Sequence, residues 1–227
     1  IPSIPTVTSQ TVCAGANTTS ITYNPSPATA TVNWTNSNAT IGIGVSGSGD
    51  IASFAGLNAG SSTATGNFVA TPTLNGCNGT PRNFSISVNP IPSIPAVANQ
   101  TVCANVSTNA ITFISTPVGA TINWTNSNGT IGQGVSGSGN IPAFNGVNIG
   151  TTAVSGNFVA TPTLSGCVGA AQNFTITVNP LPTVSASSDA PKCVNQTVTF
   201  SSSGGVSYSW TGPISYTSSS QNPVLPT

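Results

Sequence analysis

The sequence predicts an all-β protein made of tandem β-sandwich modules that follow one another in an extended rod. Three observations predict this class: a repeat of fixed length, a composition that favours strands, and short runs in which apolar and polar residues alternate. Each observation is a local property of the sequence, and together they indicate an array of similar modules.

The repeat comprises residues 1–90 and 91–180, which align from end to end without an insertion or deletion. For example, VNWTNSNATIGIGVSGSG returns as INWTNSNGTIGQGVSGSG, and GNFVATPTLNGC returns as GNFVATPTLSGC. A long fixed period indicates that each unit folds as a module and that function belongs to the array. Residues 1–90 are named module 1, residues 91–180 module 2, and residues 181–227 the third unit.

The composition and the alternation both favour strands. Glu and Met are absent, Leu is scarce, and Thr, Val, Ile and aromatic residues dominate the apolar pattern. Within module 1, residues 21–23, 32–34 and 84–88 alternate between apolar and polar side chains, as half-buried antiparallel strands do. Segments rich in Pro, Gly and Asn separate such runs about every 10 residues, which predicts a sandwich of about seven strands.

Each complete module has two cysteines at matching positions. Cys13 and Cys77 lie as far apart in the sequence as Cys103 and Cys167 do, and the chain has no His to complete a zinc site. We therefore expect one disulfide within each module, which would stabilise it by about 4 kcal/mol. Free buried thiols are the alternative. Cys193 is unpaired within the chain, and we expect its partner beyond Thr227.

The order cysteine, tryptophan, cysteine is typical of an immunoglobulin-like core, in which an indole packs near a disulfide between the sheets. Each tryptophan lies in an alternating run. We therefore expect Trp34, Trp124 and Trp210 to be core aromatic residues. Exposed indoles that stack on sugar rings are the alternative.

The module boundaries are rich in proline, with NPIP at residues 89–92 and NPLP at residues 179–182. Proline restricts its own backbone and that of the preceding residue, so these linkers are expected to be semi-rigid. From residue 181 the repeat changes, and we interpret the third unit as an incomplete module of a different type. Either the polypeptide continues beyond it, or another chain supplies the missing strands by donor-strand addition.

Charge is almost absent, which excludes several classes of function. Only 2% of residues are charged: Arg82, Lys192, Asp50 and Asp189. The chain has no basic stripe for nucleic acid or anionic lipid, and no run of 18 apolar residues that could span a membrane. We therefore expect no nucleic-acid partner and no membrane insertion of this segment.

The residue supply also argues against catalysis and cofactor binding. A nucleophilic hydrolase needs a base to activate its nucleophile, and a glycosidase needs paired carboxylates; this chain has no His, no Glu and only two isolated Asp residues. The glycine-rich VSGSGD lacks the lysine and the following helix of a phosphate loop. We expect no catalytic residue, no metal and no cofactor.

The motifs VCAG, NWTNSN, IGxGVSGSGxI, TPTLxGC and NFSISVNPxP resemble the PKD-like, immunoglobulin-like repeats of large cell-surface proteins of Bacteroidota. The resemblance covers residues 1–180, and the third unit, with KCVNQTVTF, is similar to a second PKD-like type. It implies an extracellular multidomain protein of the gliding-adhesin kind, exported by type IX secretion, in which such modules form a stalk. The acidic residues that could coordinate calcium in some such repeats have no counterpart here, since Asp50 of module 1 is replaced by Asn140 in module 2.

The expected function is therefore a non-catalytic stalk segment of a long secreted adhesin or extracellular filament at the cell surface. Its expected partners are neighbouring modules of the same chain, or identical chains in a filament. A pilin-like subunit assembled by donor-strand exchange is the first alternative, motivated by the third unit. A carbohydrate- or ice-binding surface module is the second.

Overall fold

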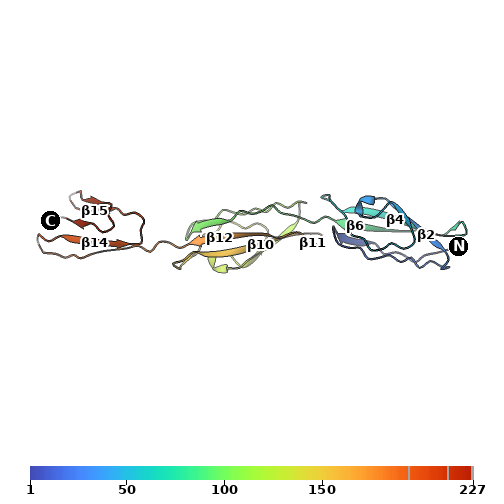
Figure 1. Ribbon diagram of the computed structural model, residues 1–227, viewed down its shortest axis with the longest axis horizontal. Coiled ribbons are helices and arrows are strands. Elements are labelled where there is room, and N and C mark those ends of the chain that lie inside the picture. The colour runs from blue at the N-terminus through green and yellow to red at the C-terminus, as the bar shows by residue number, and fades with distance from the viewer. Residues whose placement is uncertain (194, 214, 226–227) are drawn as a thin grey trace.

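The computed structural model describes residues 1–193, 195–213 and 215–225. Three β units lie end to end, with the N-terminus at one tip and the C-terminus at the other (Figure 1). In the described part of the chain, strands fall into four separate sheets, and the helical elements are two short 3-10 helices. The prediction of an all-β chain of immunoglobulin-like sandwich modules is confirmed.

Module 1 contains one six-stranded sheet with the order β1-β6-β4-β2-β3, in which β5 pairs with β4. Its elements are β1 (Gln10–Cys13), β2 (Thr31–Asn36), η1 (Ala39–Ile41), β3 (Ser46–Ser48), β4 (Ala64–Leu74), β5 (Cys77–Asn78) and β6 (Arg82–Asn89). The first and last strands, β1 and β6, are parallel, whereas the other pairs are antiparallel. The chain therefore enters the module at one end and leaves it at the other.

Module 2 repeats this sheet strand for strand, in the order β7-β12-β10-β8-β9 with β11 beside β10. Its elements are β7 (Gln100–Cys103), β8 (Thr121–Asn126), η2 (Gly129–Ile131), β9 (Ser136–Ser138), β10 (Val154–Leu164), β11 (Cys167–Val168) and β12 (Gln172–Asn179). The registers also match, because Phe158 lies opposite Phe174 as Phe68 lies opposite Phe84. Equivalent residues of the two modules therefore have equivalent places.

The second layer of each sandwich is extended but irregular. In module 1 it is held by isolated bridges such as Ile21 with Ile51, so the module has six regular strands where about seven were predicted. Side chains take the place of backbone partners in this layer: Gln10 bonds both backbone groups of Thr19, each at 2.8 Å, and Asp50 accepts from the Tyr23 N–H at 3.0 Å. These bonds satisfy the backbone without a continuous ladder.

The core of each module lies between the layers and is built on aromatic rings. Trp34 is 7% exposed, and its ring centroid lies 5.9 Å from that of Phe68, which stacks on Phe84 at 4.9 Å. Trp124 is 5% exposed and occupies the same place in module 2. No core residue is shared between the two modules within the described chain. Each module thus has a core of its own.

The third unit is built differently. Its strands are β13 (Ser185–Ser188), β14 (Val198–Ser203), β15 (Trp210–Thr211), β16 (Thr217–Ser218) and β17 (Val224–Leu225), and they form two small sheets. Trp210 lies 5.2 Å from Phe200, and its Nε1 donates to the Ser220 carbonyl at 3.0 Å. Because these sheets are small, Trp210 stays partly exposed and is not the buried core residue that the sequence led us to expect.

Asp50 illustrates how the polar residues of the second layer act, and it gives a first prediction. Its Oδ1 accepts from the Tyr23 N–H, and the Oδ1 of Asn140 accepts from the Phe113 N–H at 2.9 Å in the same way. Burial, and then the Asp50 carboxylate, raise the pKa of the Tyr23 phenol far above its ordinary value. An oxygen acceptor, and not a charge, is what this position requires.

We therefore expect Asp50→Asn to change the free energy of unfolding by less than about 0.5 kcal/mol, and Asp50→Ala to lower it by about 1 kcal/mol. Urea unfolding of both variants beside the unmodified chain measures the difference. Equal losses in the two variants would show that the charge itself stabilises module 1.

Candidate functional site

The charged residues do not assemble into a reactive site. Asp189 and Lys192 form an exposed ion pair of 3.0 Å, and Arg82 donates from Nε to the Ile4 carbonyl at 3.1 Å. The Thr199 N–H, and then Lys192, hold the pKa of the Asp189 carboxyl below its usual value. In the part of the chain that the structure describes, no three His, Cys, Asp or Glu residues are grouped as a metal site would need.

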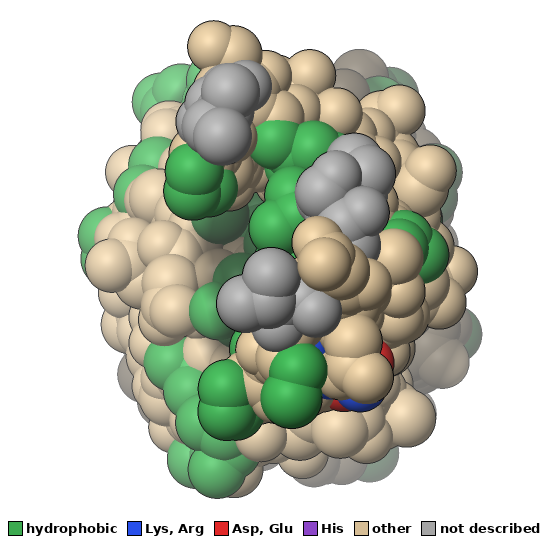
Figure 2. All heavy atoms as spheres, turned by 90° about the vertical axis from the view of Figure 1, so that its left-hand side faces the viewer, with side chains coloured by type: hydrophobic (Ala, Val, Ile, Leu, Met, Phe, Trp, Pro, Cys, Tyr) green, Lys and Arg blue, Asp and Glu red, His purple; other side chains and the backbone are tan. Residues whose placement is uncertain are grey.

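The surface is correspondingly uncharged. Figure 2 shows the C-terminal end of the molecule, where uncharged polar atoms and scattered hydrophobic side chains cover most of the face and charged side chains gather at one spot. Among the described residues, no helix is long and apolar enough to cross a membrane.

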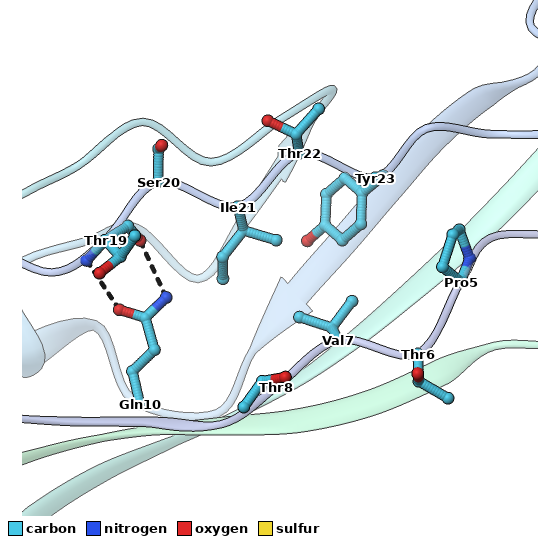
Figure 3. Close-up of a pocket in the computed structure, with 10 residues that line it drawn as sticks. All are labelled: Pro5, Thr6, Val7, Thr8, Gln10, Thr19, Ser20, Ile21, Thr22 and Tyr23. Carbon is cyan, nitrogen blue, oxygen red and sulfur yellow. Dashed lines mark hydrogen bonds between the residues drawn. The ribbon is translucent and has the colours of Figure 1, made fainter.

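A shallow groove of about 380 Å³ follows the edge of module 1 between residues 5–10 and 19–23 (Figure 3). Figure 3 shows the Gln10 amide facing Thr19, with which it makes its two hydrogen bonds. None of the lining residues is charged, and the single aromatic ring among them, Tyr23, is 1% exposed. The groove therefore lacks the exposed ring that commonly stacks on a sugar.

The most distinctive chemical feature is a covalent bond between the modules. Cys13, the last residue of β1, forms a disulfide with Cys167, the first residue of β11, with a Cα–Cα distance of 5.6 Å. The expected disulfides within each module, Cys13 with Cys77 and Cys103 with Cys167, are therefore wrong. Among the described residues, Cys77, Cys103 and Cys193 are free and exposed.

The strand order explains why the pairing crosses the modules. Cys13 lies opposite Asn89 at the end of β6, which is the end where the chain leaves module 1. Cys77 follows the far end of β4, opposite Leu74, and β4 has 11 residues, so it spans about 35 Å. A disulfide needs Cα atoms within about 7 Å, so the two cysteines of one module are too far apart.

We name the two ends of a module by what they carry. The head end carries the β4–β5 hairpin of module 1 or the β10–β11 hairpin of module 2. The tail end carries the last residues of β1 and β6, or of β7 and β12. The disulfide joins the tail end of module 1 to the head end of module 2.

A tight turn presents the head end to its neighbour. Ser165 and Gly166 both have positive φ, 49° and 80°, and they connect Leu164 to Cys167 as a two-residue hairpin loop. Positive φ at both loop residues is the requirement of a type I′ turn. This turn exposes the Ser165 carbonyl, which accepts from the Asn89 Nδ2 at 3.3 Å.

Burial shows that the two ends fit together. Cys167 is 1% exposed, whereas Cys77, at the same place in module 1, is exposed. Asn89 is 8% exposed, whereas Asn179, its counterpart in module 2, is only half-buried. Because the two modules are otherwise alike, the neighbouring module accounts for this difference.

The disulfide also creates a short covalent route along the rod. Residues 1–13 run the length of module 1 to Cys13, and residues 167–180 run the length of module 2 from Cys167, with no helix, turn or bend in either segment. The bond closes a sequence separation of 154 residues. The intervening residues, and most of both cores, thus lie outside the shortest covalent path.

No protein family matches this sequence. No curated protein matches it either. Among solved structures, it is similar to Sidekick-1 immunoglobulin domains 1–4 at 16% identity, covering 78% of this chain and 48% of that one, with a TM-score of 0.44. It is also similar to the structure of Dpr11 IG1 bound to DIP-gamma IG+IG2, at 11% identity. That similarity covers 79% of this chain and 98% of that one, with a TM-score of 0.41.

Protocadherin Gamma B7 cadherin domains 1–4 give 10% identity, 100% coverage of this chain and 76% of that one, and a TM-score of 0.38. Similarities at these identities and TM-scores do not carry a function across to this chain.

Proposed function

We propose that this chain is a structural, non-catalytic stalk segment of a long secreted protein at the cell surface, an adhesin or an extracellular filament. The observation that carries the proposal is the Cys13–Cys167 disulfide, which joins the first strand of module 1 to the second half of module 2. Because this covalent route is already extended, it suits a stalk, which carries tension and holds the distal part of the protein away from the cell.

The termini and the strand order support the same function. When the Cys13–Cys167 disulfide is reduced, tension would enter module 1 at its head end through β1 and leave it at its tail end through β6. These two strands are parallel and in direct register, from Gln10 opposite Ile86 to Cys13 opposite Asn89. Pulling these strands in opposite directions loads all their hydrogen bonds together, because the bonds lie across the direction of pull. Such an arrangement resists separation better than one that opens bond by bond.

The composition and the disulfide support an extracellular location. Disulfides persist in oxidising compartments, and an uncharged surface rich in Ser, Thr and Asn keeps its solubility over a wide range of salt and pH.

We further propose residues 1–90, 91–180 and 181–227 as the folding units. Export by type IX secretion, as in gliding adhesins, is the finer form of the proposal and stems from the PKD-like resemblance.

The experiment is to measure the mass of the native polypeptide after reduction and denaturation, identifying it by peptides that contain GNFVATPTL. A stalk of many modules predicts a mass on the order of hundreds of kilodaltons. A mass near 22.4 kDa would overturn the stalk proposal and favour a filament subunit whose third unit is completed by another chain.

A further inference from the structure

Two module ends in this chain are copies of the two that form the junction. The tail end of module 2 carries Cys103 where module 1 has Cys13, and the head end of module 1 carries Cys77 where module 2 has Cys167. Both thiols are exposed. The chain therefore presents one complementary half of the junction at each end of its two-module rod.

The backbone that holds Cys103 is the same as that which holds Cys13. In each module, the backbone N–H of the residue after this cysteine donates to the carbonyl of the Asn that ends the last strand. Ala104 donates to Asn179 at 2.8 Å, and Ala14 donates to Asn89 at 2.9 Å. The thiol of Cys103 is thus presented as that of Cys13 is.

The hairpin at Cys77 likewise copies the one at Cys167. Asn75 and Gly76 have φ of 49° and 79°, within 1° of their counterparts Ser165 and Gly166 in module 2. The pair Leu74 and Cys77 closes the loop in the same register. An Asn-Gly loop is the strongest sequence signal for this turn, so the free head end is formed without its neighbour.

We propose that a second copy of this chain docks head to tail on these ends and closes a disulfide between Cys103 of one chain and Cys77 of the other. The new junction would continue the one already formed between modules 1 and 2. In this arrangement Asn179 would donate to the Asn75 carbonyl of the second copy, as Asn89 donates to Ser165. The inference deepens the proposed stalk function by naming its partner, and rests on it for its biological use.

Cys193 does not supply the missing half. Cys193 lies as far along the sequence from the start of the third unit as Cys13 and Cys103 lie from the starts of modules 1 and 2. It therefore corresponds to a tail-end cysteine. It also lies outside the strands of the third unit, where its N–H bonds the Gln196 side chain at 3.3 Å. By the pattern of the observed junction, Cys103 would pair with a head-end cysteine. Among the described residues these are Cys77, which is free, and Cys167, which is already bonded.

The chemistry is thiol–disulfide exchange with a small disulfide such as oxidised glutathione. One protein thiolate attacks the small disulfide and releases one small thiol, leaving a mixed disulfide on the protein. The second protein thiolate then attacks the protein sulfur of that mixed disulfide and releases the other small thiol. Two protein thiols are oxidised to one disulfide, the small disulfide is reduced to two thiols, and the two protein protons pass to those thiols.

The test uses the full chain with Cys193→Ser in every sample, and two further variants, Cys77→Ser and Cys103→Ser. In a glutathione redox buffer we expect each variant alone to stay monomeric, since one lacks the head-end thiol and the other lacks the tail-end thiol. An equimolar mixture is expected to give at least about ten times more disulfide-linked dimer, because docking raises the local thiol concentration. The chain with both thiols should form a ladder of oligomers on non-reducing gels.

Peptide mass spectrometry of the dimer should find Cys103 linked to Cys77, with Cys13–Cys167 intact. As a control, the same mixtures in 8 M urea should couple thiols without preference, so that single variants also dimerise. Equal dimerisation of the single variants and the mixture under native conditions overturns the proposal, as does the absence of dimer in the mixture. Neither result alters the native mass, so failure here is distinguishable from failure of the stalk proposal.

Discussion

Reduction of the Cys13–Cys167 disulfide is expected to increase the length released by modules 1 and 2 under tension by about 500 Å. With the disulfide closed, only residues 1–13 and 167–180 carry the load, and they are already extended. A strand rises ~3.3 Å per residue and a fully stretched chain at most ~3.6 Å, so unfolding of both cores would add only about 10 Å. Reduction frees the 154-residue separation, which stretches to about 500 Å.

Single-molecule force spectroscopy with attachment at the two termini measures this difference, before and after addition of a reductant. The third unit contributes equally to both traces. Cys13→Ser should release the longer length without reductant, and Cys193→Ser, the control, should leave both traces unchanged.

Two other outcomes would count against the junction disulfide. Release lengths that do not respond to reductant would show that Cys13 and Cys167 are not linked. Two equal steps of about 50 Å under oxidising conditions would show instead that each module contains its own disulfide. About 26 residues of each module would then be free to extend to about 90 Å, from a folded length of about 45 Å.

Gly47→Ala is expected to destabilise module 1 by about 3 kcal/mol through overpacking of its core. A Cβ atom at Gly47 would overlap the indole of Trp34, and the three nearest atoms all belong to that ring. The ring has little room to move, because it is buried and lies 5.9 Å from the ring of Phe68. The substitution therefore forces the indole or the β2–β3 pair out of place.

Differential scanning calorimetry of the chain measures this effect module by module. For a domain of this size, 3 kcal/mol lowers the melting temperature of module 1 by at least about 10 °C, while module 2 should melt at its usual temperature. Gly137→Ala should reverse the pattern, because Gly137 faces Trp124 in the same way. Equal shifts of both transitions in either variant would contradict independent cores.

Gly44→Ala is the matched control on the same segment. The nearest atom to a Cβ there is the Ser46 carbonyl oxygen at 3.8 Å, an ordinary contact. We expect its melting temperature to stay within about 2 °C of the unmodified chain. A large fall in the melting temperature of this variant would mean that any added side chain in the segment disturbs the fold. The effect of Gly47→Ala could then not be assigned to overlap with Trp34.

Strands whose side chains alternate strictly were the most predictable part of the fold. Burial in β2 alternates residue by residue and places Val32 and Trp34 in the core, as the pattern predicted. The alternation at residues 21–23 predicted burial of the right side chains, but not that Gln10 and Asp50 would take over backbone partners there. Such replacements depend on residues distant in sequence, which periodicity does not report.

The junction shows what local pattern could not reveal. The repeat placed cysteines at matching positions, and pairing within a module was the simplest interpretation of that spacing. One signal pointed the other way: the Asn75–Gly76 turn just before Cys77 puts this cysteine at a hairpin tip, and a hairpin tip lies at an end of a sandwich. Which end Cys13 reaches depends on the parallel pairing of β1 with β6.

The sequence alone thus determined the class of the protein: repeated modules, strands, and a composition with almost no charge and neither His nor Glu. These are properties of composition and of neighbouring residues, which determine secondary structure and solubility directly. The tertiary structure decided which sulfur atoms meet. That choice depends on the ends to which strands far apart in the sequence carry Cys13 and Cys167, and on modules stacking tail to head so that those two ends touch.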